Sequence, residues 1–455
     1  MAPRVFNTLT RGKEDLAPLH AGLVRMYVCG VTVYDLSHIG HGRSAIVFDV
    51  MRRYLKHRGH AVKFIKNFTD IDDKIIRKAN QEGVSAQEIS ERYIEEYRTD
   101  MASLGVAPAD IEPKATEHVP QMIALIERLI AKGVAYPVEG DVYFEVRRFP
   151  GYGKLSGKNL EELQAGARVE VDERKRDPMD FALWKATKPG EPSWKSPWGQ
   201  GRPGWHIECS AMAARFLGET FDIHGGGIDL VFPHHENELA QSRAAFGTKV
   251  MANVWLHNGF LQVEGEKMSK SLGNFVTIRE ALRDWPGEVI RLNMLKTHYR
   301  QPIDWTEAGL REAGRTLDQW YEAAGDAAPG MLCADAVDAL SDDLNTPKAF
   351  TALYALRDEA AAGSVGAKAS LKATAQLLGL LGPTATEWHR ARRSAAGVDE
   401  RRVAEFIASR VAARKARNFA EADRIRAELE AMGIAVKDSK DPKTGELTTA
   451  WEVKR

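Results

Sequence analysis

Residues 23–59 constrain this chain more than any other stretch, because an apolar run, a polar turn and a helical repeat follow one another there. Leu23 to Val28 has the composition of a short strand. Beyond the turn, apolar residues recur at helical spacing, at Val47, Val50, Met51, Tyr54 and Leu55. Gly59 then stands where such a helix would end. Strand, turn and helix in this order predict the phosphate-binding edge of an open α/β sheet, because the first N–H groups of the helix are unpaired and partly positive.

The turn itself carries groups suited to a binding site. Cys29 ends the strand, and His38 and His41 open the helix three residues apart, on one side of it. Gly40 and Gly42 have no side chain to keep a ligand away from the backbone. Taken alone, a histidine pair at a helix start more often serves capping or core packing than catalysis.

The following segments continue the strand and helix alternation of a parallel sheet up to about residue 120. A second strand is predicted at 62–68, ending in a run with three aspartates. We expect Asp70 to cap the next helix rather than to bind magnesium, since carboxylates suit a first helical turn. Thr69, at the carboxyl end of this strand, is the better candidate for a ligand contact.

Residues 121–200 break this alternation. One helical stripe runs over 119–130 and stops at Gly133, and a hairpin is expected around Gly140. Trp184, Trp194 and Trp198 follow among Gly- and Pro-rich turns, as anchors of a small core. We therefore predict an insertion that divides the sheet domain in two.

The sheet is predicted to resume at 204–210, and a further strand begins at Phe221 and enters a triple glycine ending at Gly227. Such glycines let the backbone approach a nucleotide, and Asp229 could accept from ribose hydroxyls. A helix is expected to open at 233–238, and another strand at 255–260 leads to Lys267–Ser271. Thr277 and Glu280 then form a predicted capping box.

His234 and Glu238 are spaced i, i+4, so both project from one side of the predicted helix. Cys29 and Cys209 each stand at the end of a predicted strand, in the two halves of the divided sheet. Two thiols, an imidazole and a carboxylate favour zinc over a hard ion such as magnesium. The alternative is two ordinary buried cysteines beside a surface helix.

The remainder, from about 310, is alanine-rich and helical. Thr346, followed by Pro347, is expected to cap a helix. Near the end, Arg410, Arg414 and Arg417 are expected to share one helix face that could meet an RNA backbone.

Charge and cysteine usage add two bounds. Lys plus Arg and Asp plus Glu both number 63, so any surface for nucleic acid must be local. Three cysteines cannot make a disulfide framework, which favours a reducing compartment. The chain has no apolar run of membrane-spanning length and no apolar signal core, so we expect a cytoplasmic protein without membrane contact. We also expect a monomer.

His38-Ile-Gly-His41 early and Lys267-Met-Ser-Lys-Ser late resemble the two signatures of class I aminoacyl-tRNA synthetases. The resemblance narrows to cysteinyl-tRNA synthetases on further strings spread over nearly the whole chain, at 26–30, 67–74, 180–185, 204–210, 224–238 and 343–347. Departures are Val31 where proline is common, Gly42 where alanine is common, and a longer tail at 437–447.

This resemblance implies an α/β fold with a Rossmann-type parallel-sheet catalytic domain split by an insertion, then an α-helical bundle and a small C-terminal domain. The expected bounds are 1–120 and 201–257 for the catalytic domain, 121–200 for the insertion, 258–310 for a stem-contact region with the lysine loop, 311–390 for the bundle and 400–455 for anticodon binding. The implied reaction activates L-cysteine with ATP and Mg²⁺, then transfers it to tRNA(Cys).

The resemblance also implies roles for single residues. The expected catalytic residues are His38, His41, Lys267 and Lys270. The expected ATP contacts are Gly40, Gly227, Asp229 and Lys270. The expected substrate pocket holds Thr69, Trp205 and His224, and the expected zinc ligands are Cys29, Cys209, His234 and Glu238. Two rivals remain: a ligase that joins activated cysteine to an amino sugar, and a non-catalytic RNA-binding paralogue.

Overall fold

Four parallel strands form the central sheet of the computed structural model, in the spatial order β11 (Ala252–Asn258), β10 (Phe221–Gly227), β3 (Leu23–Thr32) and β4 (Ala61–Thr69). The structure describes residues 3–159, 161, 162, 173–269, 272–395, 400–440 and 447–453. The strand that follows β3 in the chain, β4, pairs with one edge of β3, whereas the later strand β10 pairs with the opposite edge. Their carboxyl ends therefore meet at a point where the strand order reverses, which is where open α/β sheets bind ligands.

Helices cover both faces of this sheet. One face packs on α1 (Ile39–His57), with α3 (Ala86–Ser103) against β4 and α9 (Gly287–Leu295) against α1. The other face packs on α6 (Trp205–Leu217), and α4 (Val119–Ala131) and α7 (Glu236–Phe246) pack against α6. Alternation along β3 sends Met26 and Val28 to the first face, and Tyr27 and Cys29 to the second. The predicted α/β class is confirmed.

The remaining elements of the first half flank this sheet. They are β1 (Arg4–Asn7), β2 (Gly12–Asp15), α2 (Asp73–Glu82) and the 3-10 turns Ala115–His118 and Val146–Arg148. Asp70 does not cap α2, so that prediction was wrong: Asp72 accepts from the Lys74 N–H, whereas Asp70 accepts from Thr116. The chain stays extended two residues longer than the sequence suggested.

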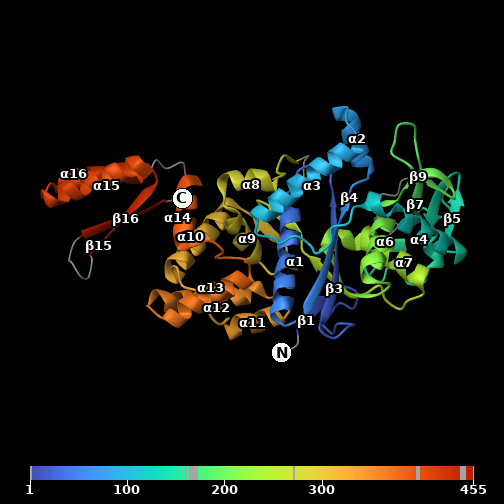
Figure 1. Ribbon diagram of the computed structural model, residues 1–455, viewed down its shortest axis with the longest axis horizontal. Helices are drawn as coiled ribbons and strands as arrows, with labels where there is room; N and C mark the ends of the chain where they lie inside the picture. The colour runs from blue at the N-terminus through green and yellow to red at the C-terminus, as the bar shows by residue number, and fades with distance from the viewer. Residues whose placement is uncertain are drawn as a thin grey trace.

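An antiparallel sheet of five strands forms one end of the molecule (Figure 1). Its strands are β5 (Ala135–Val138), β6 (Asp141–Phe144), β7 (Phe181–Ala186), β9 (Gly199–Pro203) and β8 (Trp194–Ser196), in that order. The hairpin predicted at Gly140 is confirmed, with Gly140 in the left-handed region at φ 87°. Trp184 is fully buried, while Trp194 and Trp198 are partly buried against the same core.

The strand predicted at 204–210 is wrong, because this segment opens α6. Short apolar runs do not distinguish strand from helix by periodicity. Here Gly204 ends the β-sheet pairing as the cap of α6, so Cys209 lies inside a helix rather than at a strand end.

A small sheet of β12 (Leu261–Val263), β13 (Glu266–Lys267) and β14 (Ile303–Trp305) lies within the helical half, with α8 (Ile278–Asp284) and α9 between β13 and β14 in the chain. The other helices of this half are α10 (Glu307–Ala324), α11 (Ala334–Ser341), α12 (Thr346–Ala361), α13 (Val365–Leu377) and α14 (Ala385–Ala395). The capping box of Thr277 and Glu280 on α8 is confirmed. Asn345, rather than Thr346, caps α12, with Pro347 in its first turn.

The C-terminal unit projects at the end opposite the five-stranded sheet (Figure 1). It contains α15 (Glu400–Lys415), α16 (Phe419–Ala431), β15 (Ile434–Lys440) and β16 (Leu447–Val453), with a separate small core. Arg410 and Arg414 both pair with Asp438 on β15, and Arg417 lies beyond α15, so the predicted shared basic face is wrong. Residues 441–446 of the longer tail lie outside the described residues.

No helix in the described ranges combines the length and the apolar character needed to cross a membrane.

A buried ion pair joins the sheet domain to the helical half. Asp49 on α1 accepts from Arg291 on α9 and from Arg53 at 2.7 Å. Arg291 also donates to the carbonyl oxygen of Leu378, just after α13, at 2.7 Å, and to that of Gly105 at 3.0 Å. One fully buried guanidinium thus connects α1, the α3 end and the bundle.

Replacing Arg291 with methionine is expected to lower the free energy of unfolding by about 3 kcal/mol, since Asp49 would stay buried without its main cation. The measurement is urea unfolding followed by tryptophan fluorescence. Arg311→Met, which removes an exposed i, i+4 pair with Glu307, is the matched control and should cost less than about 1 kcal/mol. Equal destabilisation by the two variants would contradict this account of the joint.

Candidate active site and metal centre

Four buried donor side chains meet below the carboxyl edge of the sheet. Cys29 comes from β3, Cys209 from α6, His234 from a π-helical turn over Val231–His235, and Glu238 from the first turn of α7. Their donor atoms all lie within 4.8 Å of one another. The i, i+4 spacing of His234 and Glu238 does direct both toward one point, with 3.0 Å between Nε2 and Oε1.

The neighbours of these donors hold them in orientation. His206 contacts the Nδ1 atom of His234 at 2.9 Å through its own Nδ1, which leaves Nε2 facing the cluster. His224 contacts Oε2 of Glu238 at 2.8 Å, while Oε1 lies 3.1 Å from the Cys29 Sγ atom. Such outer partners fix the tautomer and position of metal ligands.

The donor set fits a zinc ion. A tetrahedral zinc site with bonds of about 2.0–2.3 Å separates its ligand atoms by about 3.3–3.8 Å, which the 4.8 Å limit accommodates. Two thiolates and a carboxylate without a cation would be costly in a site where every donor is buried. A second set shares Cys29 and Glu238 and adds His224 and His235. The first set is the softer, because it has two thiols.

The protonation of the cluster follows from burial and from its close contacts. Burial raises the pKa of the Cys29 thiol well above its usual value. Burial also raises the pKa of Cys209, but hydrogen bonds with Cys29 and His234 outweigh this and lower it to about 6. Burial acts likewise on Glu238, yet His224 and His234 hold its pKa well below the usual range. Thiolate is thus an accessible form of Cys209 and carboxylate of Glu238, whereas the raised pKa keeps Cys29 a neutral thiol near pH 7.

The three predicted substrate-pocket residues differ in their exposure and in their contacts with this cluster. Trp205 is 39% exposed and stacks on the His234 ring, with 4.1 Å between centroids. Thr69 is buried and donates to Glu208 at 2.9 Å. His224 lies behind Glu238 and stacks on Trp255, at 4.5 Å. The cluster therefore has its partly open side at Trp205.

The histidine turn lies at the neighbouring edge, where α1 begins. His38 caps α1, because its Nδ1 atom accepts from the Gly40 N–H at 3.1 Å. Its ring stacks on that of His41, with 3.6 Å between centroids. A Cβ at Gly40 would lie 2.9 Å from the His38 ring, so only glycine leaves this arrangement undisturbed. Burial lowers the pKa of His41 well below its usual value, which makes it a neutral imidazole near pH 7.

The lysine loop is attached directly to this turn. The Ile39 N–H donates to Val276 at 3.1 Å, and the Ile278 N–H donates to Ser37 at 2.8 Å. Lys267 is exposed on β13. Lys270 lies outside the described residues. The two motifs, more than 200 residues apart in sequence, are therefore adjacent in the fold.

The triple glycine ends β10 beside the same edge. A Cβ at Gly225 would lie 2.3 Å from the Phe48 ring of α1, and one at Gly226 would lie 2.9 Å from the His235 ring. Gly227 is partly exposed, and Asp229 is exposed on the 3-10 turn Ile228–Leu230 that follows. The first two glycines are explained by packing, whereas Gly227 and Asp229 face outward at the sheet edge.

Sequence reasoning missed several residues of this region. His206 and Glu208 lie on the segment taken for a strand, so no helical spacing tied them to Cys209 or Thr69. His257 contacts His235 at 2.7 Å and Thr8 at 2.8 Å, which extends the buried imidazole network to the N-terminal segment. The sequence did contain one clue to these residues, namely the several histidines at 206, 224, 234, 235 and 257. Buried histidines need polar partners, so a group of them indicates a hydrogen-bonded network.

Comparisons with known proteins identify the family of this chain. The family model described as tRNA synthetases class I (C) catalytic domain matches residues 15–315, and the cysteinyl-tRNA ligase anticodon binding domain matches residues 400–444. The chain is 54% identical to the cysteine–tRNA ligase of Azorhizobium caulinodans over 467 residues, and 51% identical to that of Afipia carboxidovorans over 467 residues. These alignments cover all of both chains in the first case and 99% of each in the second.

Solved structures share the fold at low sequence identity. Mycobacterium tuberculosis methionyl-tRNA synthetase in complex with methionyl-adenylate has a TM-score of 0.54 at 14% identity, over 80% of this chain and 93% of that one. An Agrobacterium radiobacter LeuRS–tRNA–LeuAMS ternary complex has a TM-score of 0.55 at 13% identity, over 85% and 86%.

Proposed function

Because the chain belongs to the cysteine–tRNA ligase family of class I aminoacyl-tRNA synthetases, we propose a division of roles between its buried donor cluster and its two signature motifs. The enzyme activates L-cysteine with ATP and transfers it to tRNA(Cys). The observation that carries the proposal is the donor cluster, which lies at the same sheet edge as the histidine turn.

Cys29, Cys209, His234 and Glu238 would hold one zinc ion per chain. When bound, zinc supplies a Lewis acid that favours a substrate thiol over a hydroxyl, a distinction for which a plain pocket gives only roughly a hundredfold. His206 and His224 keep the ligands His234 and Glu238 oriented. Trp205, stacked on His234 and partly exposed, would close over the substrate side chain, and the Thr69 hydroxyl, fixed by Glu208, would line the pocket.

The histidine turn and the lysine loop would serve the ATP phosphates, with Mg²⁺ accompanying ATP. The first N–H groups of α1 are partly positive, and Gly40 leaves them accessible. His38, His41, Lys267 and Lys270 would stabilise negative charge on the departing pyrophosphate, since such transfers need preorganised donors more than a protein nucleophile. Gly227 and Asp229 at the β10 edge would meet the nucleoside.

The tRNA would contact the remaining segments. We assign the catalytic domain to 1–120 and 201–257, the insertion to 121–200, a stem-contact region to 258–310, a helical bundle to 311–390 and anticodon binding to 400–455. The 400–444 match to an anticodon binding domain favours tRNA over an amino-sugar acceptor. The proposed thiolate ligands need a reducing compartment, so we place the enzyme in the cytoplasm. We also propose that it acts as a monomer.

The test is transfer of labelled cysteine to total tRNA, run beside cysteine-dependent ATP–pyrophosphate exchange. Exchange together with acid-precipitable label on tRNA is expected. Exchange without label on tRNA would favour the amino-sugar ligase, and absence of both would favour the non-catalytic paralogue.

A further inference from the structure

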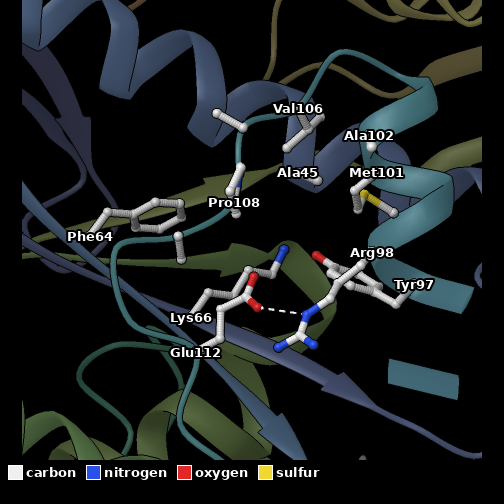
Figure 2. Close-up of a pocket in the computed structure, with 12 residues that line it drawn as sticks. Ala45, Phe64, Lys66, Tyr97, Arg98, Met101, Ala102, Val106, Pro108 and Glu112 are labelled. Carbon is white, nitrogen blue, oxygen red and sulfur yellow. Dashed lines mark hydrogen bonds and ion pairs between the residues drawn. The ribbon is translucent and has the colours of Figure 1, made fainter. Parts of the chain in front are cut away.

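A cavity of about 270 Å³ lies on the side of the sheet away from the donor cluster (Figure 2). It is bounded by the edge strand β4, by α1 and α3, and by the loop at 106–112. Phe64, Tyr97 and Met101 give it apolar walls, and Ala45 of α1 lines it one helical turn beyond His41.

Alternation along β4 places the cavity and the proposed zinc ligands on opposite faces of the sheet. Phe64 and Lys66 point toward α1 and α3 and line the cavity, whereas Ile65 between them packs in the core that contains Cys29 and Cys209. The sheet therefore separates this cavity from the proposed zinc ligands.

One positive charge in the cavity wall has no carboxylate to balance it. Lys66 is 9% exposed, and its ammonium lies 5.3 Å from the Tyr97 ring centroid. In Figure 2 the Lys66 nitrogen and the Tyr97 hydroxyl reach into the cavity from opposite sides. Within the described part of the chain, no carboxylate is within ion-pair distance of Lys66. Burying an ammonium without such a partner is costly.

The neighbouring cation does not share this property. Arg98 is paired with Glu95 at 2.6 Å and with Glu112 at 3.0 Å, and the second pair crosses the cavity rim (Figure 2). Two carboxylates thus face this one guanidinium, so Arg98 offers a ligand no unpaired positive charge, and the cation that a ligand would meet inside the cavity is Lys66.

We propose that this cavity is a second ligand site, which binds a small organic carboxylate with a compact apolar body. Its volume holds roughly nine non-hydrogen atoms, at the ~30 Å³ that each water occupies in the liquid. The apolar body would pack between Phe64 and Met101, and the carboxylate would pair with Lys66. Ligand sites of this kind are mostly apolar, with a few well-placed polar groups.

The probes are benzoate and benzamide, which have the same shape and differ in charge. Calorimetric titration into the full-length enzyme, with cysteine and ATP already saturating, is expected to give benzoate a Kd of about 1 mM, in the range for so small a ligand. Benzamide is expected to bind at least about tenfold more weakly, the factor for a free-energy difference of about 1.4 kcal/mol. Equal binding of the two probes, or loss of benzoate binding when the substrates are present, would overturn the proposal.

Variants locate the binding. Lys66→Met should weaken benzoate about tenfold while leaving benzamide unchanged, and Lys56→Met, at an exposed position near the end of α1, should change neither. Ala102→Phe, at an exposed position of α3 on the rim, should abolish binding of both probes by filling the mouth. Retention of benzoate affinity in Lys66→Met would also overturn the proposal.

Discussion

Replacing Cys209 with serine is expected to remove the zinc and to lower kcat/KM for cysteine activation by about a thousandfold or more, since even an outer-shell ligand partner contributes 10–100-fold. Cys209 is 1% exposed and lies on α6 facing Cys29, His234 and Glu238. A serine hydroxyl keeps the shape of the side chain but is a harder donor that gives up its proton far less readily than a thiol.

Two measurements check this result: zinc per chain by elemental analysis, and ATP–pyrophosphate exchange over a range of cysteine concentrations. Cys333→Ser is the matched control, because Cys333 lies at the start of α11, outside the donor cluster. It should retain one zinc per chain and full exchange. Full zinc and full selectivity against serine in Cys209→Ser would refute the assignment of the ligands.

Replacing His41 with alanine is expected to slow ATP–pyrophosphate exchange by about 10²–10³-fold, the loss typical of one preorganised donor to transition-state charge. The effect should appear in kcat, with little change in KM for cysteine, because His41 lies at the start of α1 and outside the donor cluster. His57→Ala removes an exposed histidine at the other end of the same helix and should leave exchange unchanged.

His38 needs a different variant, because its ring also caps α1. Alanine would combine the loss of a cap, worth about 1 kcal/mol, with the loss of the imidazole. Asparagine is a good cap, so His38→Asn should keep the melting temperature while exchange still falls. Unchanged exchange in both His41→Ala and His38→Asn would show that the turn serves only capping and packing.

The fold was predictable wherever a local pattern and its tertiary setting agreed. The stretch from Leu23 to Gly59 has a strand, a turn and a helix in the order typical of a parallel sheet, and the structure has them as β3 and α1. The stripe over 119–130 and the capping box at Thr277 are similarly local. Each of these signals lies within one continuous stretch of the chain, so it could be recognised without knowledge of distant contacts.

The wrong predictions concern segments whose structure or exposure is decided by contacts with distant parts of the chain. The segment at 204–210 is too short to show a strand or helix period, and the cap at Gly204, whose N–H donates to Leu183 of β7, makes it a helix. Arg410 and Arg414 look like a solvated basic face until β15 brings Asp438 against them. The pairing of Asp49 with Arg291, 242 residues apart, has no local signal at all.

The donor cluster was predictable in its members but not in its support. His234 and Glu238 could be linked by helical spacing, and two thiols were available to join them. The roles of His206 and His224 depend on ring nitrogens whose partners come from other segments. Residue types therefore indicated a candidate metal site, whereas the groups that orient its donors were visible only in three dimensions.

The spread of the donor cluster along the chain has a consequence for biosynthesis. Cys29 and Glu238 are separated by 209 positions, and at translation rates of about 5–20 residues per second the first thiol waits about 10–40 s for its last partner. During that interval a metal ion can bind at most some of the four donors. The Cys29 thiol is also open to oxidation or to binding a metal ion without the other donors. A metal that needs all four donors would therefore bind only after residue 238 has been made, late in synthesis of the catalytic domain.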